Sequence, residues 1–183
     1  IFGWCVIFHI FCAETVWVFG KVAKNKRFVR NQTKHISRES DMKIEKKILD
    51  DIINCTPLLP PESGGILGGK NGVITRYCAD DGVSYMSARY APNVDVLNAA
   101  IEQWSTEGVE LYGIYHSHYT KDRMLSKGDM TYIEKLMGSL PPSIRSLYFP
   151  IVLPRKEVIA YRADWSGGML HIVCDTIEIN ERM

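Results

Sequence analysis

The stretch GIYHSHYTKDRMLSKGDM, residues 113–130, is the most informative part of the sequence. It links a segment with the pattern of a strand to a segment with the pattern of a helix through a short loop. The residues before it are mostly apolar from Val109 onward, which predicts a buried strand over 109–116. A helical pattern starts near Ser126 and stops at Pro141-Pro142. Its predicted inward face carries Met130, Ile133, Leu136, Met137 and Leu140. We therefore expect a strand followed by a helix that packs on the same sheet.

Polar residues mark both ends of that loop. His116 and His118 stand two positions apart at the strand end, so both imidazoles point to the same face. Asp129 follows in the first turn of the expected helix. Two imidazoles and one carboxylate suit zinc, and three protein ligands leave a fourth position for water, as in catalytic sites. The spacing predicts a catalytic zinc centre held by His116, His118 and Asp129.

Two other interpretations of these residues stay open at this point. A His-x-His pair on a strand is a weak signal by itself, and Ser126 with Asp129 also fits a capping box at a helix start. The capping and metal roles are compatible, since a helix start would fix Asp129 in place. Two histidines and a carboxylate also hold iron in non-haem oxygenases, which generally draw the third ligand from a distant strand.

The complete pattern resembles a known signature. His116-Ser-His118, seven residues, Ser126, two residues and Asp129 is similar to the motif of the JAMM zinc metalloproteases, the JAB/MPN/Mov34 family. That family also requires an upstream glutamate, and Glu62 stands in PPESGGILGG, residues 60–69. The resemblance covers most of the chain after Met42. The chain lacks the long insertions of the large eukaryotic deubiquitinases of this family, and it resembles the minimal, prokaryote-type members.

The resemblance implies a fold and a role for each residue. The fold is mixed α/β (α+β), a cytidine-deaminase-like MPN/JAB fold with a central mixed sheet flanked by two or three helices. His116, His118 and Asp129 are implied as the ligands of one catalytic Zn²⁺. Glu62 is implied as the general base, and Ser126 as the donor that stabilises the oxyanion; amide hydrolysis needs both functions.

The same resemblance implies a zinc-dependent metallopeptidase or isopeptidase, a deubiquitinase-like hydrolase. Its expected substrate is the C-terminal tail of a ubiquitin-like or sulfur-carrier protein, with hydrolysis of small peptides or cysteine adducts ranked second. The alternatives are a catalytically weak MPN-type scaffold and a non-haem iron enzyme. All the expected functional positions are filled, which disfavours a pure scaffold.

Two residues depart from the family pattern. Tyr119 and Leu125 stand where the family commonly has proline. Neither residue is an implied ligand, so the expected metal site is little affected. These two residues affect the shape of the 119–125 loop. The substrate that the site admits depends on that shape, so it is not implied by the resemblance alone.

The rest of the chain predicts further helices and strands. A helix is expected from Lys43 to before Pro57, and a hairpin with its turn at Asp81-Gly82 joins strands over 72–80 and 82–90. The apolar face of the first helix carries Ile44, Ile48, Leu49, Ile52 and Ile53. Asn93 is expected to cap a second helix with Val94, Leu97, Ile101 and Trp104 on one face. Three more strands are expected over 147–153, 156–163 and 168–177.

Composition narrows the class of protein. A chain of 183 residues with 46% hydrophobic residues has enough length for one domain with a real core. The net charge of +1 argues against a nucleic-acid-binding protein, which usually has a large basic excess. Five scattered cysteines favour free thiols in a reducing compartment, so we expect a cytoplasmic protein.

The composition changes at Met42. Residues 1–20 are almost entirely apolar and a basic stretch follows, a pattern that fits a membrane anchor and also fits a segment 1–41 that is no part of the native folded protein. Glu14 inside the apolar run is costly at mid-membrane. We expect residues 42–183 to form the metalloprotease domain and to stay soluble and active without the extension.

Overall fold

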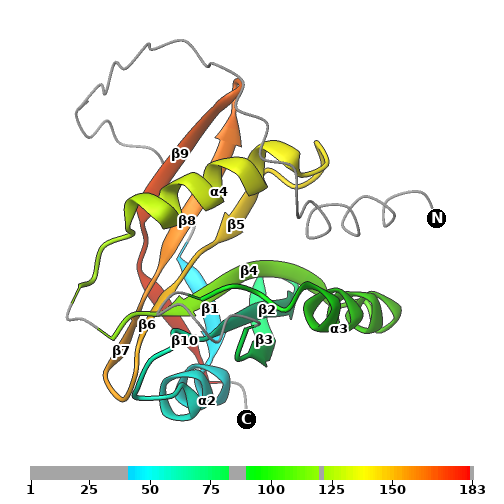
Figure 1. The fold of residues 1–183 in the computed structure, drawn as a ribbon. Helices are drawn as coiled ribbons and strands as arrows, with labels where there is room; N and C mark the ends of the chain where they lie inside the picture. The colour runs from blue at the N-terminus through cyan, green and yellow to red at the C-terminus, as the bar shows by residue number, and fades with distance from the viewer. Residues whose placement is uncertain (1–40, 83–89, 120–121, 182–183) are drawn as a thin grey trace.

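The computed structural model describes residues 41–82, 90–119 and 122–181 (Figure 1). The expectations for residues 1–40 therefore lie outside the described residues. The described helices are α2 (Lys46–Cys55), α3 (Val94–Thr106) and α4 (Lys127–Ser139). The first strands are β1 (Met42–Glu45), β2 (Gly64–Lys70), β3 (Val73–Asp80), β4 (Glu110–Ser117) and β5 (Ser146–Tyr148). The remaining strands are β6 (Ile151–Leu153), β7 (Glu157–Ile159), β8 (Tyr161–Ser166), β9 (Met169–Cys174) and β10 (Ile177–Asn180).

One mixed sheet carries the fold. Its main path runs β10-β1-β3-β2-β4-β5-β8-β9, and β6 pairs with β4 and with β7. The β2–β3, β2–β4 and β8–β9 pairs are antiparallel, whereas β4 runs parallel to β5 and β6. The expected mixed α/β architecture, a central sheet flanked by helices, is confirmed.

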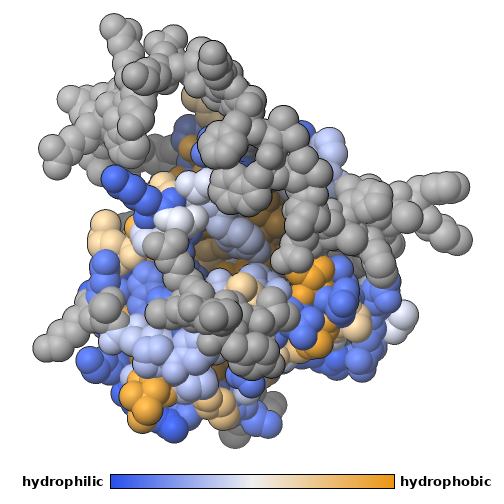
Figure 2. Space-filling view, viewed as in Figure 1, coloured by the Kyte–Doolittle hydropathy of each residue, from blue (hydrophilic) through white to orange (hydrophobic). Residues whose placement is uncertain are grey.

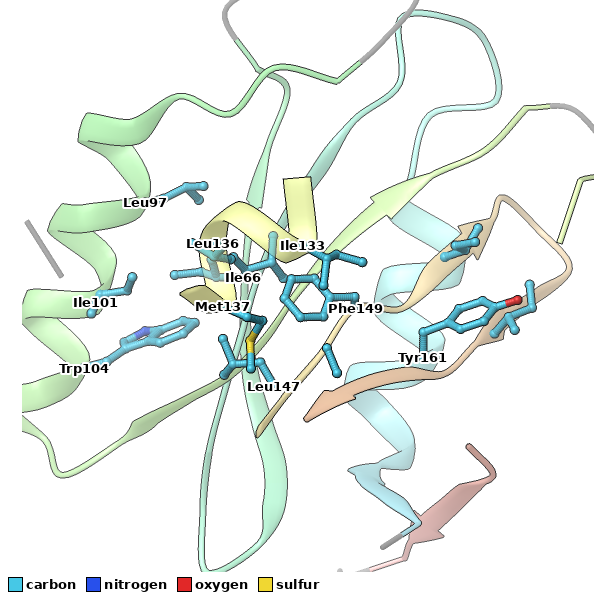
Figure 3. Close-up of a cluster of buried hydrophobic side chains, with 14 of the residues drawn as sticks. Ile66, Leu97, Ile101, Trp104, Ile133, Leu136, Met137, Leu147, Phe149 and Tyr161 are labelled. Carbon is cyan, nitrogen blue, oxygen red and sulfur yellow. The ribbon is translucent and has the colours of Figure 1, made fainter. Parts of the chain in front are cut away.

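Both faces of the sheet are covered. Ile66 and Leu67 are consecutive in β2 and belong to different hydrophobic clusters, because neighbouring strand residues point to opposite faces. The larger cluster lies under α3 and α4 and includes Leu97, Ile133 and Phe149 (Figure 3). The smaller cluster lies under α2. Because helices cover both faces of the sheet, the central strands are held in a fixed position. The end of β4 is held in the same way.

The start of the first helix was predicted too early. Residues 42–45 form β1, which pairs in parallel with both β10 and β3. Met42 and Ile44 are buried while Lys43 between them is exposed, which is the alternation of a strand. Ile44 therefore lies in the strand, and α2 buries Leu49 and Ile52. Four residues are too few for sequence periodicity to separate the two structures.

The β2–β3 hairpin was not among the turns predicted from the sequence, and the hairpin expected at Asp81-Gly82 runs into residues 83–89, which lie outside the described ranges. β2 and β3 are joined by Asn71-Gly72, both with positive φ (52° and 80°). Asn-Gly is a favoured pair for a two-residue hairpin turn, so the sequence contained the signal. The predicted strand over 72–80 is confirmed as β3, and the strand expected over 82–90 falls largely on residues outside the described ranges.

The C-terminal strands are shorter and more numerous than expected. The stretch 147–153 splits at Pro150 into β5 and β6, the stretch 156–163 splits into β7 and β8, and 168–177 splits into β9 and β10. The helix α4 buries Ile133, Leu136 and Met137 as predicted, but Met130 is 38% exposed. Figure 1 shows α4 lying along β8.

The described surface mixes hydrophilic side chains with some exposed hydrophobic ones. On the face shown in Figure 2, hydrophilic residues predominate and hydrophobic ones form small groups. Within the described residues, no helix has the length and apolar character needed to cross a membrane.

Candidate metal centre

The two histidines lie where β4 ends between two neighbouring segments. On one side the amides of His116 and His118 donate to the carbonyls of Pro150 and Val152, at 3.2 and 3.0 Å. On the other side Ser117 N–H donates to Ser63 O at 2.8 Å. Because the backbone is held on both sides, the two imidazoles of this extended segment lie on one face, as the spacing predicted.

The aspartate comes from the start of α4. Ser126 is the N-cap residue, its hydroxyl accepts from Asp129 N–H at 3.2 Å, and its own N–H donates to Asp129 Oδ2 at 2.6 Å. The capping-box interpretation is therefore confirmed. The box fixes the aspartate's χ angles, so the carboxylate points back toward the end of β4.

These three side chains, hereafter the metal triad (His116, His118 and Asp129), converge on one point. The two Nε2 atoms are 2.9 Å apart. Each Nε2 atom lies 3.5 Å from one oxygen of the Asp129 carboxylate. The structure thus brings together the three residues that the sequence predicted as metal ligands.

The charge state of the triad follows from its contacts. Hydrogen bonding to Asp129 raises the pKa of His118 above its ordinary value, against the opposing effect of burial. Burial by itself would raise the pKa of Asp129, but the bonds to His116 and His118 outweigh it and hold that pKa well below its usual range. Asp129 is therefore an anion at neutral pH, as a metal ligand must be.

The donor set fits a zinc ion. Zinc–ligand distances of about 2.0–2.2 Å in a tetrahedral site place neighbouring donor atoms roughly 3.3–3.5 Å apart. The observed separations of 2.9, 3.5 and 3.5 Å are close to that spacing. His118 Nδ1 lies 3.2 Å from the carbonyl oxygen of Asp122, an acceptor that leaves the Nε2 lone pair directed into the triad. These residues could hold a metal ion.

Glu62 reaches the same place through strand register. Gly64 of β2 pairs with His116 of β4 in an antiparallel ladder, so the residue two before Gly64 lies opposite the residue two after His116. This register continues beyond β2, since Ser63 and Ser117 exchange two hydrogen bonds. Glu62 therefore faces His118, although the two residues are far apart in sequence.

A second segment contacts Glu62. Tyr90 N–H lies 3.4 Å from Glu62 Oε2, and the Tyr90 hydroxyl donates to Asp80 at 2.8 Å. Asp80, which is only 7% exposed, also accepts from Asn93 N–H at 2.7 Å. The Tyr90 ring lies where a Cβ on Gly64 would stand, 2.4 Å from the nearest ring atom, so Gly64 makes room for it. Burial and the bond to Asp80 raise the pKa of Tyr90, which stays neutral.

A cleft of about 420 Å³ contains these groups. Its size is typical of sites for small molecules or short peptide segments. One part of the lining is polar and comprises Glu62, Asp122, Ser126 and the metal triad. The other part is mostly apolar or aromatic and comprises Tyr90, Pro92, Ile114, Tyr115, Tyr132, Ile133 and Phe149.

Part of this cleft was not predicted from the sequence. Tyr90 and Tyr132, which line it, were not singled out, and neither was Asp80, which accepts a hydrogen bond from Tyr90. Tyr90 comes from a segment that was expected to be a strand, and no local pattern identifies these residues, because contacts distant in sequence bring them to their places.

Comparisons with known proteins give a fold and no family. No protein-family model matches the chain, and no curated protein matches it. Among solved structures, protein DSY2949 from Desulfitobacterium hafniense is similar with a TM-score of 0.52 and 16% identity, over 78% of this chain and 94% of that chain.

Two further solved structures are less similar. AF2198, a JAB1/MPN domain protein from Archaeoglobus fulgidus, has a TM-score of 0.42 and 15% identity over 76% of this chain and 99% of that one. A protein from Salinibacter ruber has a TM-score of 0.45 and 19% identity, over 75% of this chain and 92% of that one.

Proposed function

We propose that this chain is a zinc-dependent peptidase or isopeptidase of the JAMM type. The observation that carries the proposal is the convergence of the metal triad in a cleft that Glu62 also lines. The resemblance of the sequence pattern to the JAMM signature supports it. Two imidazoles with one carboxylate are the ligand chemistry of zinc hydrolases, which favours zinc over a harder cation.

Each residue has a role in breaking an amide bond. Zinc, when bound, supplies a Lewis acid that polarises the substrate carbonyl and activates water. Glu62 accepts the proton that water gives up as the new C–O bond forms, and passes it to the leaving amine as the C–N bond breaks. This role is supported by the lining of the cleft, which Glu62 shares with His118, and by the antiparallel register that sets the two residues opposite each other.

Ser126 would stabilise the oxyanion in addition to capping α4. Its oxygen accepts a hydrogen bond from Asp129 N–H, and a hydroxyl that accepts in this way still has its own proton to donate. That proton is available to the negative oxygen of the tetrahedral intermediate. The confirmed cap and the proposed catalytic role are therefore compatible.

The proposed substrate is the C-terminal tail of a ubiquitin-like or sulfur-carrier protein. The resemblance to the JAMM family supports this choice, and a cleft of about 420 Å³ is in the size range of sites that bind small molecules or short peptide segments. Hydrolysis of small peptides or cysteine adducts is the second candidate, which the apolar lining beside the triad favours.

One experiment tests the proposal. Zinc-loaded protein and its Glu62→Gln variant are offered folded ubiquitin-like fusions and short unstructured peptides. Turnover that needs both zinc and Glu62 supports the peptidase, and turnover of peptides alone moves the substrate to the second candidate. No turnover of either substrate by the zinc-loaded protein contradicts the proposed function.

A further inference from the structure

Tyr119 makes a contact that its place in the sequence did not suggest. It directly follows the second histidine, where the JAMM pattern commonly has proline. Its hydroxyl donates to the carbonyl oxygen of Pro61 at 2.6 Å, across 58 positions of sequence. Pro61 is the residue immediately before Glu62, so this bond ties the loop after β4 to the segment that carries the proposed base.

Two neighbouring bonds continue the same connection. Ser117 N–H donates to Ser63 O at 2.8 Å, and Ser63 N–H donates to Ser117 Oγ at 3.0 Å. Ser117 is fully buried and Ser63 is 7% exposed, so this pair is shielded from water. Glu62 is thus held from both sides, by Ser117 through Ser63 and by Tyr119 through Pro61.

The segment just before Glu62 depends on Tyr119 for its hydrogen bonding to the loop after β4. Pro60 and Pro61 have no backbone N–H, so their carbonyls are the only backbone groups that can form hydrogen bonds. The contact from Tyr90 N–H to the Glu62 carboxylate is long, at 3.4 Å. The Tyr119 bond is the shortest of those that join residues 61–63 to the rest of the site.

We propose that Tyr119 is a positioning residue, whose hydroxyl fixes Pro61 and thereby places the Glu62 carboxylate at the metal triad. This inference rests on the base role proposed for Glu62. Proton transfer depends on distance and angle, and displacement of a reacting group by about 1 Å can cost 10²-fold in rate. A tyrosine at position 119 does this work through its hydroxyl alone, so phenylalanine would keep the ring and remove the function.

The first test measures position without using activity. Tyr119→Phe is compared with Tyr112→Phe, a matched control whose hydroxyl accepts from Gly72 N–H at 2.8 Å in the β2–β3 turn. Hydrogen exchange of the metal-free protein is followed for the Ser63 amide and for Ile114 within β4. We expect Ser63 to exchange about tenfold faster in Tyr119→Phe only, the factor for loss of one net hydrogen bond, with Ile114 unchanged.

The second test measures catalysis by the zinc-loaded protein. We expect Tyr119→Phe to lower kcat about tenfold while KM and zinc affinity stay within twofold, and Tyr112→Phe to change none of them. Unchanged Ser63 exchange, equal acceleration at Ser63 and Ile114, or an unchanged kcat would overturn the proposal. If the wild-type protein hydrolyses nothing, the peptidase assignment fails, while the Ser63 exchange still decides whether Tyr119 holds the Glu62 segment.

Discussion

Two clusters of charged and titratable side chains lie on the same sheet and differ in what completes them. In the arginine cluster (Arg162, Asp164 and Asp175), the guanidinium donates to both carboxylates at 2.6–2.8 Å. In the metal triad, a carboxylate faces two imidazole nitrogens at 3.5 Å, and the nitrogens face each other at 2.9 Å. The first cluster contains its own cation, whereas the second brings together three side chains that could hold a metal ion.

The difference distinguishes a cluster of paired charges from a candidate metal site. Arg162 joins β8 to the segment between β9 and β10, and its contacts have normal hydrogen-bond lengths. The triad lines the cleft together with a further carboxylate, Glu62. Partly buried carboxylates are common in both kinds of cluster, so the arrangement of donors and acceptors is what identifies a candidate metal site.

Of the effects expected to distinguish the two clusters, the largest is on turnover. We expect Glu62→Gln to lower turnover by about 10²–10⁴-fold and to leave zinc binding intact, because general acid–base help is lost. Asp164→Asn, the same chemical change in the arginine cluster, should leave turnover unchanged and lower the free energy of unfolding by about 1 kcal/mol. Steady-state kinetics and urea unfolding measure both. Near wild-type turnover in Glu62→Gln would remove the assigned role.

The next effect separates catalysis from capping at α4. Ser126→Ala should slow turnover by about 10²-fold and cost around 1 kcal/mol of stability. Asn93→Ala is the matched control, since the Asn93 side chain caps α3 by accepting from Val96 N–H. It should cost a similar stability without changing turnover. If Ser126→Ala behaves like Asn93→Ala, the serine is a cap and nothing more.

A smaller effect concerns stability with and without zinc. Zinc at 100 times its dissociation constant should stabilise the folded protein by about 2.7 kcal/mol. Arg162→Met should be less stable than wild type yet keep the full zinc-dependent gain, whereas His116→Ala should lose that gain. Thermal unfolding with and without zinc measures the pair. An equal gain in all three proteins would place the metal outside the triad.

The smallest effect is on the pH dependence of zinc affinity. Zinc binds unprotonated imidazole, and Asp129 raises the pKa of His118 above its ordinary 6.5. Zinc affinity should therefore fall about tenfold per unit as pH drops below that raised pKa. Asp129 stays ionised across pH 5–8 because its pKa is lowered. Competition with a chelator checks this; a flat affinity over that range would argue against histidine ligands.

The sequence predicted the triad because its signals are local. His116 and His118 are two residues apart on one strand, and Asp129 is placed by a capping box that Ser126 opens. Such short-range patterns survive folding, since strand alternation and helix capping involve few other residues. The mixed α/β class followed from the same kind of pattern.

The remaining features depend on contacts that are distant in sequence. β1 is four residues long and exists because β3 and β10 flank it, so periodicity assigned Ile44 to a helix. The bond from Tyr119 to Pro61 and the approach of Tyr90 to Glu62 join segments that no local pattern connects. The strand breaks at Pro150 and before Tyr161 likewise reflect pairing with different partner strands.

The central claim is that the triad binds one catalytic zinc, and a metal count tests it most directly. Purified protein is equilibrated with zinc, freed of excess metal and analysed for elemental content beside His118→Ala and Asp164→Asn. The account predicts one zinc per chain in the wild type and in Asp164→Asn, and none in His118→Ala. No zinc in the wild type, stoichiometric iron instead, or one zinc in His118→Ala would contradict it.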